Sequence, residues 1–200
     1  MKLKEFIKVS NYRKIKSYKE ILEYDKKFNA SFLGESTFPK YLEKKLEWKT
    51  IEFYRKFQAN QDNFWGKYYL KKIDNLEAKT GIHFEANPNI GKGLIIGHWG
   101  RIILNGNVKF GDNIFLTHGI TIGRDVRGKR AGVPTIGNRV CIRANSTIVG
   151  NIIIGDDVLI APNTFVNFDV PSHSVVIGNP ATVHHKSNAT EGHLLSLIHI

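Results

Sequence analysis

One histidine, His98, stands out among the side chains of this sequence that could take part in chemistry. It follows Gly97 and interrupts a regular pattern of aliphatic residues, so packing does not explain its position. A neutral imidazole has an unperturbed pKa of about 6.5, which suits the removal of a proton near pH 7. His118 follows twenty residues later, in the run Leu-Thr-His-Gly. We therefore take His98 as the first candidate for a general base. His118 is a second candidate base, a pocket-lining residue or a surface histidine without a role in the site.

The segment that must position both histidines is a six-residue repeat between residues 89 and 166. Its apolar positions slip by two residues after Ile96 and are interrupted for longer after Ile122. The repeat positions are Ile90, Ile96, Leu104, Phe110, Leu116, Ile122, Ile136, Ile142, Ile148, Ile154, Ile160 and Val166. A period of six fits neither an α-helix nor a long strand, but it is typical of a β-helix with three short flat faces. We expect Asn113, Asn138 and Asn145 to form corners of that coil.

The first 80 residues are expected to be helical. Apolar residues recur at three- and four-residue intervals from Pro39, which predicts a helix with this proline in its first turn. A second helix is predicted from Asp62 to Ala78, with Gly81 as its stop. Aromatic residues are dense in this region, and we expect most of them to lie in the core. They are Phe53, Tyr54, Phe57, Phe64, Trp65, Tyr68 and Tyr69.

The basic charge of the chain is concentrated in the same region. Residues 1–80 hold 19 basic and 11 acidic residues, so +8 of the net +11 lies there. Such a surface can serve nucleic acid, an anionic membrane surface or acidic small molecules. The sequence has no zinc-finger spacing and no RNA-binding signature, so we expect a solvated helical surface and no nucleic-acid partner.

The sequence predicts a protein of the cytoplasm. The start of the chain, Met-Lys-Leu-Lys-Glu, leads into charged sequence without the apolar run of a signal peptide. No apolar stretch reaches membrane-spanning length. The single cysteine, Cys141, cannot form an internal disulfide, which fits a reducing compartment, and we expect it to point outward or to lie in a subunit contact.

We divide the chain into three segments: a helical region (1–80), a β-helix domain (81–183) and a C-terminal tail (184–200). The tail ends in Leu-Ser-Leu-Ile-His-Ile at residues 195–200, which matches the translation of a sequencing adapter. We expect these six residues to be an assembly artefact, so they carry no functional argument.

Residues 89–183 resemble the left-handed β-helix, or hexapeptide-repeat, acyltransferases. The likeness is strongest to the serine acetyltransferase-like branch, which includes polysaccharide O-acetyltransferases. It is carried by the stretch from Gly93 to Asn105 around His98, by the segment from Gly128 to Gly137, and by Ile-Gly-Asn-Pro-Ala at 177–181. The resemblance implies a mainly β left-handed parallel β-helix. It also implies an acetyl-CoA-dependent O-acetyltransferase that forms a homotrimer, with active sites in the grooves between subunits.

The resemblance also implies roles for individual residues. His98 becomes the catalytic base that takes the proton of the acceptor hydroxyl, and Glu85 becomes a candidate acidic partner that orients its ring. The candidate residues for the acceptor are His118, Arg127 and Arg130, and those for the CoA substrate are Ala144, Ala161 and Lys186. No metal is expected, because a carbonic-anhydrase-like zinc site needs three converging histidines and no close histidine pair accompanies His98 and His118.

The acceptor is expected to be a hydroxyl of a saccharide precursor. Serine-specific members of the branch carry an Asp before the catalytic histidine and an Arg-His pair before the proline of the loop. Here Gly97 and the pair Gly132-Val133 stand at these places. Because a guanidinium matches a carboxylate in a bidentate pair, the joint loss of these groups argues against free serine. Serine O-acetylation remains the alternative, and a non-catalytic trimeric scaffold is an alternative of another class.

Overall fold

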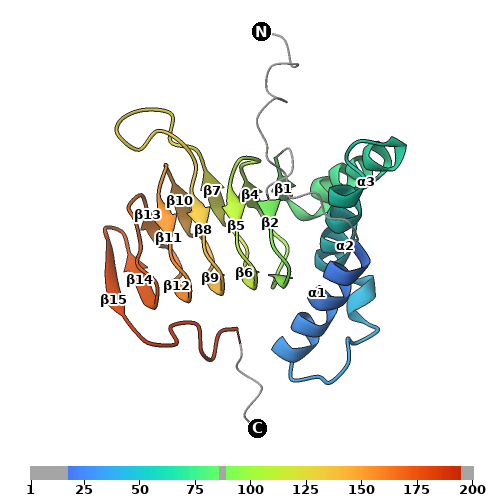
Figure 1. The fold of residues 1–200 in the computed structure, drawn as a ribbon, viewed down its shortest axis with the longest axis horizontal. Helices are drawn as coiled ribbons and strands as arrows, with labels where there is room; N and C mark the ends of the chain where they lie inside the picture. The colour runs from blue at the N-terminus through green and yellow to red at the C-terminus, as the bar shows by residue number, and fades with distance from the viewer. Residues whose placement is uncertain (1–17, 86–88, 195–200) are drawn as a thin grey trace.

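The structure, a computed structural model that describes residues 18–85 and 89–194, packs three helices against one end of a parallel β-helix (Figure 1). The helical region contains α1 (Tyr18–Phe32), the 3-10 turn η1 (Leu42–Lys44), α2 (Leu46–Ala59) and α3 (Phe64–Thr80). Within the described residues, no helix is long and apolar enough to cross a bilayer.

Three sheets form the three faces of the coil. Sheet A contains β1 (Ile82–Phe84), β4 (Ile102–Leu104), β7 (Thr121–Gly123), β10 (Thr147–Val149) and β13 (Phe165–Val166). Sheet B contains β2 (Asn89–Ile90), β5 (Lys109–Phe110), β8 (Thr135–Ile136) and β11 (Ile153–Ile154). Sheet C contains β3 (Leu94–Ile96), β6 (Ile114–Leu116), β9 (Val140–Ile142), β12 (Val158–Ile160), β14 (Ser174–Gly178) and β15 (Ala181–His185). All neighbouring strands pair in parallel except β14 and β15, which form a hairpin that closes sheet C.

The six-residue repeat builds the core of the coil, as the sequence predicts. All twelve repeat positions are buried, with exposures of 6% or less. The register stacks equivalent residues of successive coils, so that Ile96 pairs with Leu116 and Leu116 pairs with Ile142. Each coil therefore buries its aliphatic side chains against the coils above and below it, and neighbouring repeats together make one core. The prediction of a parallel β-helix is confirmed.

The corners of the coil only partly match the predicted asparagines. Asn113 and Asn145 have a backbone φ of 61°, which lies in the left-handed region that a tight corner requires. Asn138 does not adopt this conformation, because the next residue, Arg139, takes the corner with a φ of 52°. The Asn138 side chain instead accepts a hydrogen bond from the backbone N–H of Asp112 at 2.9 Å, which links two coils.

The predicted helices are present, but one of them begins later than expected. Helix α3 ends at Thr80, and the next residue, Gly81, provides the predicted stop with a φ of 68°. The Asn63 side chain caps the start of the helix. The helix expected from Pro39 is wrong at its beginning, because α2 starts at Leu46 after η1. The Phe38 ring packs 4.3 Å from the Trp48 ring, centroid to centroid, which holds the preceding segment folded back over α2.

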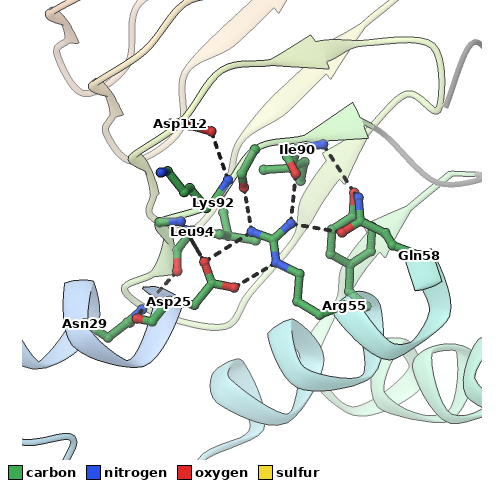
Figure 2. Close-up of polar contacts among 11 residues, drawn as sticks. Asp25, Asn29, Arg55, Gln58, Ile90, Lys92, Leu94 and Asp112 are labelled. Atoms are coloured by element: carbon green, nitrogen blue, oxygen red, sulfur yellow. Dashed lines mark hydrogen bonds and ion pairs between the residues drawn. The ribbon is translucent and has the colours of Figure 1, made fainter. Parts of the chain in front are cut away.

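A buried ion pair fastens the helical region to the first coil (Figure 2). Asp25 of α1 and Arg55 of α2 are both 0% exposed, and the Arg55 Nε lies 2.7 Å from the Asp25 Oδ2. The guanidinium also donates to the carbonyl oxygens of Ile90 (2.8 Å) and Gly91 (2.6 Å). The other Asp25 oxygen accepts the backbone N–H of Gly93 at 2.6 Å. Two helices and the coil therefore share one set of charge-assisted hydrogen bonds.

The expectation that most aromatic residues of this region lie in the core fails on α3. Phe64, Trp65 and Tyr68 are exposed by 74%, 53% and 42%. The buried face of the helix consists of smaller and aliphatic residues, Gly66, Ile73, Leu76 and Thr80. At 100° per residue this face lies on the side of the helix opposite to Phe64 and Tyr68, so their rings point away from α2.

The outer face of sheet C carries a second apolar cluster, which is covered within the chain. Its residues are Ile95, Phe115, Cys141 and Leu159 on the sheet, Phe28 and Phe32 on α1, and Leu194 of the C-terminal segment. Cys141 points away from the coil interior, which is one of the two positions predicted for it. It is nevertheless 0% exposed, because α1 and the C-terminal segment cover this face of sheet C. Burial raises the pKa of its thiol to about 12.

Asp157 holds the C-terminal segment against the coil. Its carboxylate is 0% exposed and accepts the backbone N–H groups of Ala189 (3.0 Å) and Thr190 (3.1 Å), the Thr190 hydroxyl (2.7 Å) and the His173 ring (2.9 Å). Burial by itself raises the pKa of Asp157, but these hydrogen bonds stabilise the carboxylate more strongly and hold its pKa at about 2.

Asp157 is expected to make the stability of the protein depend on pH below about 4. Its pKa in the folded chain, about 2, lies below its ordinary value of 3.8. The carboxylate therefore contributes on the order of 2 kcal/mol above about pH 4, and this contribution is lost as the pH falls toward 2. Urea unfolding at pH 6 and pH 2 checks this: Asp157→Asn should destabilise the protein at pH 6 and much less at pH 2. The exposed Asp74→Asn is the control, and equal losses at both pH values for Asp157→Asn would contradict the role.

Candidate active site

The two candidate histidines lie together at one corner of the coil, where the chain passes from sheet C to sheet A. His98 follows β3 by two residues and His118 follows β6 by two residues, and the pairing of Ile96 with Leu116 aligns them. Their ring centroids are 6.1 Å apart in a T-shaped arrangement with an interplanar angle of 69°. Both rings are exposed. The twenty residues between His98 and His118 correspond to one coil of three six-residue steps plus the two-residue slip after Ile96. The two imidazoles therefore lie at one site.

A pocket of about 210 Å³ opens beside His98, and the helical region forms most of its wall. The coil contributes Ile96, Gly97 and His98, and the remaining lining residues are Asn29, Phe38, Leu42, Lys45, Glu47, Trp48 and Ile51. Two aromatic rings in contact at an interplanar angle of 46°, one exposed cation and one half-buried anion thus face the same space as the imidazole. A molecule in this pocket would contact helical residues and His98 together.

The helical half of this pocket was not predicted from the sequence. Lys45 and Glu47 are two charged residues among many in residues 1–80, and nothing in their spacing separates them from a solvated surface. Asn29 is placed by its side-chain amide, which donates to the carbonyl oxygens of Asp25 (2.8 Å) and Leu94 (3.0 Å). Only the docking of the helices on the first coil brings these residues to His98.

Gly97 has no room for a side chain. A Cβ at this position would lie 2.7 Å from the Cε2 atom of Phe115, which belongs to the next coil. That ring cannot yield easily, because it packs 4.9 Å from the Phe32 ring and the Arg143 guanidinium lies 5.6 Å above it. The absence of a carboxylate beside His98 is therefore built into the packing of this coil.

Ala144 and Ala161 lie on the same corner as the histidines, farther along the coil. Ala144 is the second residue after β9, in the place that His98 and His118 hold after β3 and β6. Ala161 is the first residue after β12, in the place that Gly97 and Thr117 hold. Backbone hydrogen bonds connect the successive corners: Asn145 N–H donates to the His118 carbonyl at 3.1 Å, and Asn163 N–H to the Ala144 carbonyl at 2.9 Å. The corner is thus a continuous edge that runs from two imidazoles to small side chains.

Glu85 is not brought to His98 in this chain. It follows β1 at the corner between sheets A and B, whereas His98 lies between sheets C and A. Its carboxylate accepts a hydrogen bond from the Asn105 side chain, one coil away, at 2.7 Å. The expectation that Glu85 orients the imidazole is therefore not met, because the two residues follow different faces of the same coil.

Arg127, Arg130 and Lys186 also lie away from the histidines in the single chain. The two arginines belong to the loop between β7 and β8, at the corner between sheets A and B, and the Arg130 guanidinium donates to the Asn167 carbonyl. Lys186 follows β15, whose antiparallel course returns the chain to the start of β14, and its N–H donates to the His173 carbonyl at 2.8 Å. The closing hairpin therefore places Lys186 beside the start of β14, at the end of sheet C opposite to the corner that carries the histidines.

The described residues contain no group of three or more His, Cys, Asp or Glu side chains that could hold a metal ion.

Comparisons with known proteins agree with this architecture. The family described as Bacterial transferase hexapeptide (six repeats) matches residues 134–167. A serine acetyltransferase of Helicobacter pylori is 36% identical over 102 residues, which cover 51% of this chain and 60% of that protein. Serine acetyltransferase 4 of Arabidopsis thaliana is 39% identical over 103 residues, which cover 50% of this chain and 28% of that protein. The matched region thus spans only part of these relatives.

Solved structures match over more of the chain. The Neisseria gonorrhoeae serine acetyltransferase in complex with serine has a TM-score of 0.70 and 25% identity, covering 84% of this chain and 69% of that one. The enzyme from Brucella abortus strain S19 has a TM-score of 0.68 and 26% identity, covering 86% of this chain and 71% of that one. The predicted resemblance to hexapeptide-repeat acyltransferases of the serine acetyltransferase type is confirmed.

Proposed function

We propose that this chain, a hexapeptide-repeat β-helix protein related to the serine acetyltransferases, transfers the acetyl group of acetyl-CoA to the hydroxyl of a small acceptor. The observation that carries the proposal is the position of His98. Its imidazole lines a pocket of about 210 Å³ and stands at the head of an edge lined by small residues. One ring can therefore contact an acceptor in the pocket and a donor on the edge.

The proposed chemistry needs one base and no covalent enzyme intermediate. The acceptor hydroxyl attacks the thioester carbonyl carbon as a neutral His98 nitrogen takes the hydroxyl proton. The tetrahedral intermediate collapses, the carbon–sulfur bond breaks, and the imidazolium returns the proton to the leaving CoA sulfur. The products are an acetyl ester and CoA, and His98 is again neutral. Backbone N–H groups at the corner are the candidate donors to the oxyanion.

The edge between sheets C and A is the proposed site for the CoA arm. Ala144 and Ala161 leave the backbone accessible there, so that an extended pantetheine chain can approach the carbonyl and N–H groups of the corner. His118 lies between this edge and His98, with its ring centroid 6.1 Å from that of His98. We assign it to lining the reaction site, where it contacts either the thioester or the acceptor.

Serine is the acceptor that the comparisons favour, and this changes the expectation drawn from the sequence. The relatives reported above are serine acetyltransferases, and one of them was solved with serine bound. The pocket also contains a cation, Lys45, and an anion, Glu47, which complement the carboxylate and the ammonium of a free amino acid. They supply the two charges that the sequence lacks at Gly97 and Gly132.

A saccharide hydroxyl is the second candidate, and the packing at Gly97 favours it. A Cβ at Gly97 would meet the Phe115 ring, so this chain has no room for a carboxylate at the position where the resemblance places one in serine-specific members. The pocket walls include the rings of Phe38 and Trp48, and aromatic rings offer an apolar surface to the C–H faces of a sugar ring.

We propose a homotrimer as the assembly. Trp99, which follows His98, is 56% exposed, and Ile103 on the outer face of sheet A is 37% exposed. Both are apolar side chains beside the proposed site, where a neighbouring copy would cover them and would narrow the groove along the C–A corner.

A CoA-release assay tests the function and its acceptor. With acetyl-CoA, the full chain is expected to release free thiol when serine is added, and more slowly with sugars or nucleotide sugars. Lys45→Met and Glu47→Gln should each raise KM for serine by about 10-fold or more, because each removes a charge-assisted contact, and should leave KM for acetyl-CoA unchanged.

The exposed Lys44→Met, one residue outside the pocket, is the matched control and should keep the original constants. Turnover with a saccharide and none with serine would show that the acceptor is the saccharide hydroxyl and not serine. Absence of thiol release with every hydroxyl acceptor would refute the acetyltransferase itself.

A further inference from the structure

An exposed aromatic cluster lies at the start of α3, on the outside of the helical layer and at the end of the molecule opposite to β15 (Figure 1). It consists of Phe64, Trp65 and Tyr68, and we call it, with the lysines described next, the aromatic–basic face. The Phe64 and Trp65 ring centroids are 5.8 Å apart, and those of Trp65 and Tyr68 are 5.9 Å apart. The three rings therefore form one contiguous apolar patch, which is uncommon on the surface of a protein without a partner there.

The charged residues within the first part of α3 all have the same sign. Between Asp62 and Asp74, the charged residues are Lys67, Lys71 and Lys72, and all three are cationic. Lys67 and Lys71 are exposed, and the Lys72 ammonium lies 5.3 Å from the centroid of the Tyr68 ring. The face thus combines apolar and amphipathic rings with a local charge of +3.

We propose that the aromatic–basic face docks the protein on an anionic lipid bilayer. Trp and Tyr rings settle at the level of lipid headgroups, where the ring body is in an apolar layer and its polar atom stays hydrated. Lysines next to such rings extend their ammonium groups toward anionic headgroups. In this arrangement α3 lies along the membrane surface with its buried face still packed on α2, as expected for an interfacial helix and not for a spanning one.

The same observations argue against two other occupants. A second copy that paired through the same face would place Lys67, Lys71 and Lys72 opposite identical lysines, and like charges across an interface oppose association. A single-stranded nucleic acid would need ring faces open for stacking along a groove. Here Trp65 meets Phe64 and Tyr68 at interplanar angles of 75° and 87°, so the rings cover one another edge to face.

Vesicle co-sedimentation with the full chain tests the proposal. The protein should bind vesicles that contain phosphatidylglycerol and should bind phosphatidylcholine vesicles far less, with affinity falling as salt is raised. Lys67→Gln/Lys71→Gln/Lys72→Gln should weaken binding by on the order of 100-fold. Phe64→Ser/Trp65→Ser should weaken binding to both kinds of vesicle, because it removes the inserted rings. Light scattering on the same samples reports the oligomeric state, and circular dichroism reports the fold.

Two matched controls should bind like the original protein. Tyr41→Ala removes another ring that is 58% exposed, and Lys44→Gln/Lys109→Gln/Lys129→Gln removes the same charge from exposed positions elsewhere. Absence of binding by the original protein, or equal binding by the face variants and their controls, would overturn the proposal. A change of oligomeric state in the face variants would also overturn it and would identify the face as a contact between copies. None of these outcomes depends on the acetyltransferase activity.

Discussion

Replacing His98 with Ala is expected to lower kcat of CoA release by on the order of 10²–10⁴-fold. Without the imidazole, the acceptor hydroxyl must attack the thioester while it still carries its proton, and a neutral hydroxyl is a poor nucleophile. KM for acetyl-CoA should change little, because the proposed CoA edge is made of backbone groups and small side chains beyond His98. The measurement is steady-state thiol release with saturating acceptor, together with circular dichroism to confirm that the variant folds.

The comparison with His118→Ala decides which imidazole is the base. Its ring lies next to that of His98, so it is a matched histidine at the same site. We expect the His118 variant to keep most of kcat and to change mainly KM. A larger loss of kcat in the His118 variant would exchange the two roles. Unchanged turnover in both single variants would remove both imidazoles from the role of base, whereas absence of turnover by the original protein would favour a scaffold without catalysis of its own.

Asp25→Asn is expected to lower the free energy of unfolding by about 3–5 kcal/mol. The substitution keeps the shape of the side chain but removes the negative charge that faces Arg55. The guanidinium would remain 0% exposed with only the neutral oxygens of Ile90, Gly91 and Gln58 around it. A buried cation without a counter-ion is costly, so we expect the docking of α1 and α2 on the first coil to weaken. Urea unfolding at pH 7, followed by circular dichroism, measures the loss.

Glu23→Gln is the matched control, on the same helix as Asp25. Its carboxylate lies 3.7 Å from the Lys26 ammonium and is 65% exposed, so its removal should cost at most about 1 kcal/mol. The double variant Asp25→Leu/Arg55→Met removes both buried charges, but it should not restore the stability, because the N–H groups of Gly93 and Leu94 lose the Asp25 acceptor and the carbonyls of Ile90 and Gly91 lose the Arg55 donor. Similar small losses for Asp25→Asn and Glu23→Gln would contradict the role of the buried pair.

Loss of the Asp25–Arg55 pair should also disturb the wall of the proposed acceptor pocket. Asn29 donates to the Asp25 carbonyl and the Leu94 carbonyl, and it lines the pocket together with Trp48 of α2. The same contacts that hold the helices on the coil thus fix the wall opposite His98. The two substitutions with the largest expected effects therefore act on the two halves of one site.

The parts of this protein that could be read from the sequence are those that repeat. Each six-residue step has the same local surroundings, so the identity of one coil predicts the next, and a histidine such as His98 is visible as a departure from the pattern. The stop of α3 at Gly81 is equally local, since it depends on the backbone freedom of one residue. Ala144 and Ala161 follow β9 and β12 at the same corner of the coil as both histidines, and their contact with CoA stays a prediction.

Positions that depend on the path of the chain between repeats could not be read from the sequence, and the role of Lys186 toward CoA stays a prediction. Glu85 is close to His98 in sequence but follows another face of the coil, and Lys186 is carried to the far edge of sheet C by a hairpin that reverses direction. The aromatic residues of α3 were expected in the core, whereas the orientation of the helix on α2 leaves Phe64 and Trp65 outside. Neither the direction of a hairpin nor the rotation of a docked helix is encoded in a short stretch of residues.

The sequence by itself determined a coil of stacked six-residue repeats and the histidine that interrupts it, because both follow from spacing within one turn of the chain. Only the tertiary structure decided what stands opposite that histidine. Lys45 and Glu47 reach it from a helical segment about fifty residues earlier, and they do so because a buried Asp25–Arg55 pair docks two helices on the first coil. Contacts of this kind depend on how separate elements pack, and no local pattern records them.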